Sequence, residues 1–237
     1  MANILPFRGI FYNREKIEDL SRVLAPPYDV ISGEAQEKYY EMSQYNVIRL
    51  ILGKEFPGDN QNNNRYTRAA QFFQKWFEEE ILIRDDSPSI YLLEQEFELR
   101  SDMFGEVEAP KGKETLINRR GFIALAQLED FSKGIVRPHE GTMAEPKRDR
   151  LNLLRACRAN FCQIFLAYED REDMIDRLWE RKRNEPPLID LVNGENIRYK
   201  LWRLNDQKSI NRIVEEMRHK KLFIADGHHR YESALEY

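Results

Sequence analysis

Apolar residues recur along the chain with two different periods, which predict different elements. Apolar positions three and four residues apart are typical of a helix, whereas alternating or continuous β-branched and aromatic runs are typical of a strand. The helical pattern predicts helices over 15–24, 32–42, 65–80, from about 147 onward, 171–184, 207–220 and 229–237. The strand pattern predicts strands over 6–13, 46–52, 81–85, 89–99, 119–130, 162–168, 187–192, 197–204 and 221–226.

Residues with strong local preferences sharpen several of these boundaries. Ser32 is a suitable N-cap for the helix that follows it, and Asn205 or Asp206 for the helix at 207–220. Asn193–Gly194 between two strand patterns predicts a type I′ hairpin. The polar segment 100–118 is expected to be a mobile excursion between two paired strands.

Strands and helices are interleaved without a regular strand–helix–strand rhythm. We therefore expect an α+β (mixed α/β) fold, with a mixed sheet flanked by helices, rather than a doubly wound parallel sheet. The 237 residues, 41% of them hydrophobic, are expected to form one globular unit over 1–237.

Charge and composition limit the classes of partner. With 37 basic and 41 acidic residues, the net charge of -4 gives no electrostatic reason to expect nonspecific binding of nucleic acid. No run of 18 apolar residues is present and the N-terminus lacks the apolar run of a signal peptide, so we expect a cytoplasmic protein without a membrane span. Cys157 and Cys162 are expected to be buried free thiols. The oligomeric state stays open.

The densest polar cluster is "FIADGHHRYE" at 223–232, which reads as a strand, a turn and the start of a helix. Gly227 permits a backbone conformation that a side chain would forbid. A helix N-terminus binds anions, Arg230 is able to fork onto phosphate oxygens, and an imidazole of His228 or His229 is able to donate to phosphate or carry a proton. The alternative is structural, with Asp226 capping the helix and both histidines solvated.

Two further clusters lie far away in the sequence. "RPHEGTMAEPKRDRL" holds His139, Glu140 and Arg150, with Lys147 near a helix start, where it would neutralise phosphate while Glu140 acts as a general base. In "APPYDV", Asp29 follows a rigid proline pair and is a candidate metal or substrate ligand. A solvated loop and an Asx turn are the respective alternatives. If the three clusters form one site, they must meet in space.

Six blocks in register carry a resemblance to a known family. They are "PFRG", "LAPPYDVIS", "YNVIRLIL", "RRGFIAL", "PHE-T---PK-DRL-LL-A--AN" and "IADGHHRYE-AL-Y". From Pro6 to Tyr237 the chain resembles the bacterial and archaeal domain-of-unknown-function family 1015. Members of this family are longer, so the resemblance implies that the chain is the N-terminal part of a longer protein, with part of its site wall missing and catalysis and nucleotide binding weakened.

A more distant resemblance concerns 197–237, which is similar to the β-α-β-turn-helix core of the ParB/sulfiredoxin-like fold. ParB proteins carry Gly-Glu-Arg-Arg at the turn and sulfiredoxins Gly-Cys-His-Arg, where this chain has Gly227-His228-His229-Arg230. His228 stands at the sulfiredoxin cysteine position, so thiol-based reduction is not expected. The turn is most similar to that of free serine kinases of this fold.

The resemblance implies a nucleotide-dependent phosphotransferase acting on a small-molecule hydroxyl, with ATP or ADP and Mg²⁺ as cofactors. The roles it implies are catalytic for Glu140, His139, Asp226 and His228; cofactor-binding for Gly227, His229, Arg230, Lys147 and Arg150; and metal-binding for Asp226 and Asp29. Two alternatives stay open: a nucleotide-binding regulatory module without turnover, and a metal-dependent hydrolase with His139, Glu140, Asp226, His228 and His229 as ligands.

Overall fold

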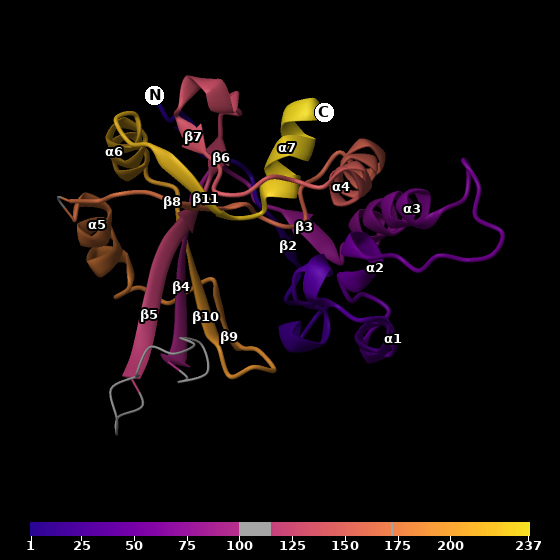
Figure 1. Cartoon of the computed structure of the whole chain (residues 1–237). Coiled ribbons are helices and arrows are strands. Elements are labelled where there is room, and N and C mark those ends of the chain that lie inside the picture. Colours follow the sequence, from indigo (N-terminus) through magenta and orange to yellow (C-terminus); the bar gives the residue numbers. More distant parts are fainter. Residues whose placement is uncertain (100–114, 172) are drawn as a thin grey trace.

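The computed structural model describes residues 1–99, 115–171 and 173–237, which form a mixed α+β structure (Figure 1). Its helices are α1 (Gly33–Met42), α2 (Ile48–Ile51), α3 (Arg65–Glu78), α4 (Ala144–Cys157), α5 (Met174–Lys182), α6 (Gln207–Met217) and α7 (His228–Glu236), with short 3-10 turns η1 (Leu20–Arg22), η2 (Tyr28–Val30) and η4 (Phe131–Lys133). Its strands are β1 (Ile4–Leu5), β2 (Ile10–Tyr12), β3 (Leu82–Arg84), β4 (Ile90–Leu99), β5 (Thr115–Ile123), β6 (Leu125–Ala126), β7 (Val136–Arg137), β8 (Phe165–Ala167), β9 (Ile189–Val192), β10 (Arg198–Leu204) and β11 (Leu222–Asp226).

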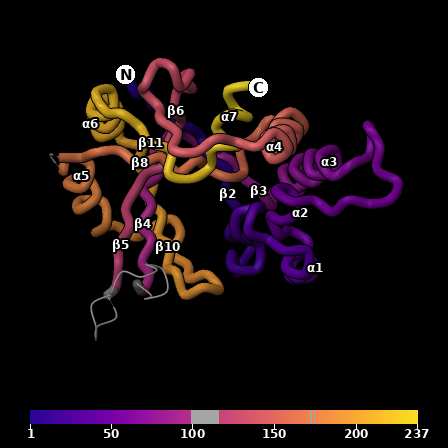
Figure 2. The backbone as a smooth tube through the Cα atoms, viewed as in Figure 1, coloured from indigo at the N-terminus to yellow at the C-terminus, as the bar shows by residue number. Residues whose placement is uncertain are grey.

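The described strands form several small sheets rather than one. The largest is antiparallel in the order β5-β4-β10-β9, and a three-stranded sheet has the order β7-β11-β8, with β11 parallel to β7 and antiparallel to β8. Two-stranded pairs join β1 to β6 and β2 to β3. In Figures 1 and 2 the helices α1–α4 gather on one side of the strands and α5 and α6 on the other, with α7 between β11 and α4.

The C-terminal segment follows the expected order of elements, β10, α6, β11, a turn and α7. However, β10 belongs to the four-stranded sheet and β11 to the three-stranded sheet, so the two strands are not neighbours. The α+β class is thus confirmed, whereas the single mixed sheet is replaced by separate small sheets.

Helix caps follow the local chemistry of the sequence. The Ser32 hydroxyl accepts a hydrogen bond from the Ala35 N–H, and the Asp206 carboxylate accepts one from Ser209. Both caps were predicted, and each satisfies an N–H group that the first helical turn leaves unpaired. The helix predicted from about 147 begins three residues earlier, at Ala144.

The strand predicted at 46–52 is wrong, because this segment contains the short helix α2. The Asn46 side chain accepts from the Ile48 N–H and donates to the carbonyls of Arg22 and Leu24. The side chains of Ile48, Leu50 and Ile51 are all buried in this helix. A short apolar run has no periodicity that separates a strand from a fully buried helix, so tertiary contacts decide.

The helix predicted at 15–24 is also wrong, since the only helical part is the turn η1. Ile17, Leu20 and Val23 are nonetheless all buried. Their spacing of three is satisfied by turns, in which residues i and i+3 lie on the same side.

The hairpin of β9 and β10 is confirmed, but its predicted type I′ turn is wrong. The Asn193 N–H donates to the Ile197 carbonyl at 3.0 Å and the Asn193 side chain accepts from the Ile197 N–H, which closes a five-residue connection. Asn196, not Gly194, takes the left-handed conformation, with φ of 61°. Of the expected excursion at 100–118, residues 115–118 belong to β5, and 100–114 lie outside the described residues.

Two main hydrophobic cores and a small bridging cluster hold the elements together. One core packs α5, α6, β4, β10 and β11 and includes Tyr231 of α7. The other packs the N-terminal helices around Trp76. Ala69, Leu153 and Cys157 join α3 to α4 between them. Each helix in the described ranges is too short or too polar to cross a membrane.

Asp85 is a buried hydrogen-bonding centre, and its removal tests how the N-terminal strands are fixed. Its carboxylate accepts from the Tyr91 hydroxyl and the Asp86 N–H, both at 2.8 Å, and lies 2.9 Å from Nε of Arg203. Asp85→Ala leaves these groups unpaired, and we expect the free energy of unfolding in urea to fall by about 3 kcal/mol. The matched control is Asp86→Ala at the exposed neighbour, where a change within about 0.5 kcal/mol is expected. Equal stability of the two variants would contradict this reading.

Candidate functional site

The histidine turn lies where β11 passes into α7. Gly227 is the N-cap of α7, with φ of 94°, and no side chain caps the helix. The N–H groups of His228, His229 and Arg230 have no acceptor in the described part of the chain, as the first turn of a helix leaves them. The predicted arrangement of a strand in a sheet followed by a helix starting close to His229 is confirmed.

Asp226 and Arg230 interact with each other across this turn. The Arg230 guanidinium pairs with the Asp226 carboxylate and also donates to the Gln163 carbonyl. It folds over Gly227 so closely that a Cβ there would lie 2.8 Å from Cζ of Arg230. Asp226 thus faces Arg230 rather than capping α7. The expected roles of Arg230 on phosphate and of Asp226 on a metal stay predictions.

His228 is almost completely buried, with 2% of its surface exposed. Its Nε2 accepts a hydrogen bond from the His139 N–H at 3.3 Å, so the neutral ring carries its proton on Nδ1. That Nδ1 lies 2.9 Å from Oε1 of Glu140. The carboxylate oxygen lies off the N–H direction, so the contact is an electrostatic one and Nδ1 has no hydrogen-bond partner.

His139 approaches the same point from the other side. Its Nδ1 donates to the Ile224 carbonyl at 2.7 Å, which leaves Nε2 with a free lone pair. The His139 and His228 rings meet edge to face, with centroids 4.5 Å apart. Together with Glu140, they offer three ligand atoms within 4.8 Å of one another, the one such group in the described ranges. Asp29, Asp226 and His229 lie outside this group.

His229 holds the loop that precedes α4. Its Nε2 accepts from the Met143 N–H at 3.0 Å, so this nitrogen does not donate to a ligand. One residue earlier, the Thr142 hydroxyl donates to the Glu232 carboxylate at 2.7 Å. The two histidines and Glu232 therefore fasten residues 139–143, which we call the strap loop, to the first turns of α7.

Beyond the strap loop, α4 continues along α7. Lys147 forms an ion pair with Glu236 at 3.2 Å, and the Ser233 hydroxyl lies 2.8 Å from the Lys147 carbonyl. Lys147 also borders an open hollow of about 360 Å³ with Phe131 and Leu235. Lys147 thus lies at the C-terminal part of α7, away from the histidine turn.

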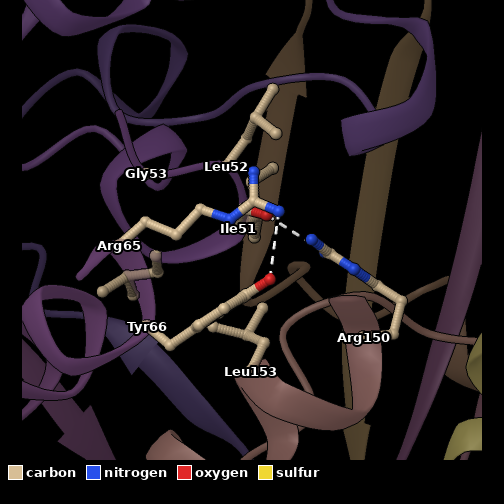
Figure 3. A pocket seen from close by; sticks show the side chains of 8 residues that line it. Ile51, Leu52, Gly53, Arg65, Tyr66, Arg150 and Leu153 are labelled. Carbon is tan, nitrogen blue, oxygen red and sulfur yellow. Dashed lines mark hydrogen bonds between the residues drawn. The ribbon is translucent and has the colours of Figure 1, made fainter. Parts of the chain in front are cut away.

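Arg150 lines a small pocket with Ile51, Arg65 and Tyr66 (Figure 3). Its guanidinium pairs with Asp149, donates to the Ile51 carbonyl at 3.0 Å and lies 3.6 Å from the centre of the Tyr28 ring. The pocket measures about 10 Å³, room for one water molecule at most. These contacts occupy Arg150, and its expected role on phosphate stays a prediction.

The cluster containing Tyr28 and Asp29 lies within electrostatic reach of the histidine turn. Burial raises the pKa of Tyr28, while the positive charges of Arg150 and Arg230 oppose that shift. Burial likewise raises the pKa of the Cys162 thiol, and Asp29 and Asp226 add to the shift while Arg230 and Arg150 oppose it. The Tyr28 ring contacts Arg150 directly, whereas no hydrogen bond or ion pair among the described residues joins Asp29 to the histidines.

Both cysteines are free thiols, as predicted, although only Cys157 is fully buried. Burial raises the pKa of the Cys157 thiol to about 11. Cys162 is half-buried.

Sequence reasoning missed several residues that build this region. Glu232 receives the Thr142 hydroxyl, and the Tyr231 hydroxyl is held by the backbone of Glu129 at 2.8 and 2.9 Å. Glu232 lies four residues after His228 on the predicted helix, a spacing that places both on one face. That spacing was available from the sequence, whereas the partner of Tyr231 is not readable from any local pattern.

Comparison with known families identifies the family of this chain. The model described as "protein of unknown function (DUF1015)" matches residues 4–237. The chain belongs to this family. Neither the curated proteins nor the solved structures give a match. The family description carries no activity, so the function is inferred from the site.

The contact between Thr142 and Glu232 is testable by a double-mutant cycle. Because the hydroxyl donates to a half-buried carboxylate, we expect a coupling energy of about 1 kcal/mol between Thr142→Val and Glu232→Ala in urea unfolding. The matched control combines Glu232→Ala with Thr67→Val, whose hydroxyl lies in the N-terminal capping box of α3. Those two changes should be additive; strict additivity of the first pair would show that the strap loop is not fastened in this way.

Proposed function

We propose that the chain is a nucleotide-dependent phosphotransferase that acts on a small-molecule hydroxyl. The observation that carries the proposal is the first turn of α7, where the N–H groups of His228, His229 and Arg230 have no acceptor among the described residues and Gly227 replaces a capping side chain. Free N–H groups and the positive end of a helix dipole favour phosphate oxygens. Glu140 lies beside the first residue of the same turn.

The nucleotide phosphates are assigned to this turn. Arg230 lies over Gly227. It would exchange its ion pair with Asp226 for one with a phosphate oxygen, because a guanidinium binds carboxylate and phosphate in the same forked geometry. Asp29 is exposed in the neighbouring cluster and, with Asp226, is the candidate holder of Mg²⁺, which usually takes one or two carboxylates plus phosphate oxygens. When bound, Mg²⁺ supplies neutralisation of charge on the transferred phosphoryl group.

Glu140 is assigned to accept the proton of the acceptor hydroxyl. Its side chain is half-exposed, at 56%, while Oε1 lies against the buried His228. That contact orients the carboxylate, and the exposed side chain is open to an approaching hydroxyl. A general base must lie within hydrogen-bond reach of the proton it removes, or one water away.

The resemblance to free serine kinases of the ParB/sulfiredoxin-like fold supports the same reaction class. It rests on the Gly-His-His-Arg turn and on the order of strand, helix, strand, turn and helix over 197–237. It is an analogy of motif, and it names serine as the first acceptor to test.

The two alternative functions differ from phosphotransfer in what they would do at this site. A regulatory nucleotide-binding module would bind ATP or ADP at the same turn without turnover. A metal-dependent hydrolase is favoured by the grouping of His139, Glu140 and His228. Of its five expected ligands, Asp226 pairs with Arg230 and Nε2 of His229 accepts from Met143.

Phosphate transfer is tested by ³¹P NMR of the chain with Mg²⁺, ATP or ADP, and serine or a pool of other hydroxyl compounds. We expect a phosphomonoester signal that grows with time. Glu140→Gln should lower kcat by about 10²–10⁴-fold with unchanged nucleotide affinity, because it removes the base and keeps the shape.

The matched control is Glu145→Gln, an exposed glutamate in the first turn of α4. It should retain the rate of the unmodified chain. Nucleotide binding with no phosphomonoester under any pairing would favour the regulatory module. Equal loss of activity in Glu140→Gln and Glu145→Gln would remove Glu140 from the proposed role.

A further inference from the structure

We propose that His139, Glu140 and His228 form a binding site for one divalent transition-metal ion of the Zn²⁺ class. The three side chains present ligand atoms within 4.8 Å of one another. Two imidazoles and one carboxylate are a donor set of open, three-ligand zinc sites and of other first-row metals, whereas Mg²⁺ prefers oxygen ligands. This site is separate from the Mg²⁺ that a nucleotide would bring.

His228 supplies the fixed ligand. Its side chain is 1% exposed, and its Nδ1 lies 2.9 Å from Oε1 of Glu140 without a hydrogen-bond partner among the described residues. A buried polar atom without a hydrogen-bond partner costs about 1–3 kcal/mol of stability. A ligand that binds between Nδ1 and the neighbouring carboxylate would remove this cost. A cation between Nδ1 and the carboxylate satisfies both groups.

His139 supplies the second imidazole in the correct tautomer. Its Nδ1–H donates to the Ile224 carbonyl, so the lone pair of Nε2 is available to a metal. A backbone carbonyl that receives the other ring N–H is the usual outer partner of a metal-bound histidine. Ile224 lies in β11, two residues before Asp226, and therefore ties the ligand to the central strand of its sheet.

Glu140 supplies the carboxylate, and it is free to adjust. Its Oε1 lies 2.9 Å from Nδ1 of His228, and a tetrahedral metal with ligand bonds of about 2.0–2.2 Å would need roughly 3.4 Å between them. The change of about half an ångström falls on Glu140, because its side chain is 56% exposed while His228 is enclosed. His139 is exposed as well, so solvent or substrate is able to reach the remaining metal positions.

Metal binding has a defined consequence for protons in this site. When Nδ1 of His228 binds the metal, its proton passes through solvent to Nε2, and the ring stays neutral. Nε2 then no longer accepts from the His139 N–H, so the 3.3 Å hydrogen bond is lost. The bond from the Met143 N–H to His229 is not involved and should persist.

This inference does not depend on the proposed phosphotransfer. If the chain binds Zn²⁺ but transfers no phosphate, the metal site holds and the proposed function fails. If it transfers phosphate but binds no Zn²⁺, the proposed function holds and the metal site fails. If both hold, Zn²⁺ should inhibit transfer, because a carboxylate that ligates the metal is not free to accept a proton.

The test is calorimetric titration of the metal-free chain with Zn²⁺, together with the visible spectrum of the Co²⁺ form and amide hydrogen exchange. We expect one Zn²⁺ per chain, Co²⁺ absorption of a four- or five-coordinate site, and faster exchange of the His139 amide with an unchanged Met143 amide. Excess Mg²⁺ should not displace Zn²⁺. His139→Ala and Glu140→Gln should each weaken Zn²⁺ binding at least about tenfold. Substituting a residue that only supports a ligand already costs about tenfold or more in metal affinity, and these two residues are ligands themselves.

The matched controls are His219→Ala, at an exposed histidine outside the cluster, and Glu145→Gln. Both should bind Zn²⁺ as the unmodified chain does. Unchanged affinity in His139→Ala and Glu140→Gln, or no binding to the unmodified chain, would overturn the proposal. His228 is buried, so its substitution risks misfolding, and the exposed His139 and Glu140 carry the test instead.

Discussion

The arrangement around the histidine turn depends on one constraint: the strap loop is held to α7 through hydrogen bonds that its backbone N–H groups donate to two histidine rings. The strap loop runs between β7 and α4 without a strand partner for the amides of His139 and Met143. Two ring nitrogens, Nε2 of His228 and Nε2 of His229, accept those two N–H groups. Adjacent histidines at the start of α7 therefore have a definite physical task, which is to hold this loop against the helix.

This constraint orders the rest of the site. Once each Nε2 is an acceptor, the proton of the neutral ring lies on Nδ1, and the Nδ1 of His228 lies 2.9 Å from Oε1 of Glu140. His139 is fixed from the opposite side by the Ile224 carbonyl of β11. The same region then has groups that suit ligands of opposite charge. The free N–H groups of α7 favour an anion, and the group of two imidazoles and a carboxylate favours a cation.

Local chemistry explains which parts of this structure were predictable. Ser32 and Asp206 cap helices through contacts within three residues, so the sequence alone predicts them. The turn at Gly227 was predictable for the same reason. Segment 46–52 was not, because the helix there depends on Asn46 reaching the carbonyls of Arg22 and Leu24 more than twenty residues away.

The site shows the same division. If the polar clusters form one site, the histidine turn and the strap loop must meet in space, and they do. What no pattern revealed is which nitrogen faces which group. Arg150 and Arg230 were expected at phosphate, yet they contact Asp149 and Asp226, respectively. A charged side chain in a sequence does not disclose whether its counter-charge lies on the protein or on a ligand.

The most direct test is the scalar coupling across the two hydrogen bonds from strap-loop amides to histidine ring nitrogens, measured by NMR in ¹⁵N-labelled protein. The account predicts a measurable coupling between the Met143 amide nitrogen and Nε2 of His229, and a weaker one between the His139 amide and Nε2 of His228, in keeping with distances of 3.0 and 3.3 Å. In the metal-free protein, both Nε2 resonances should be those of unprotonated nitrogens. A proton bonded directly to Nε2 of either ring in the metal-free protein would contradict the account, because the strap loop would then have to be held in another way.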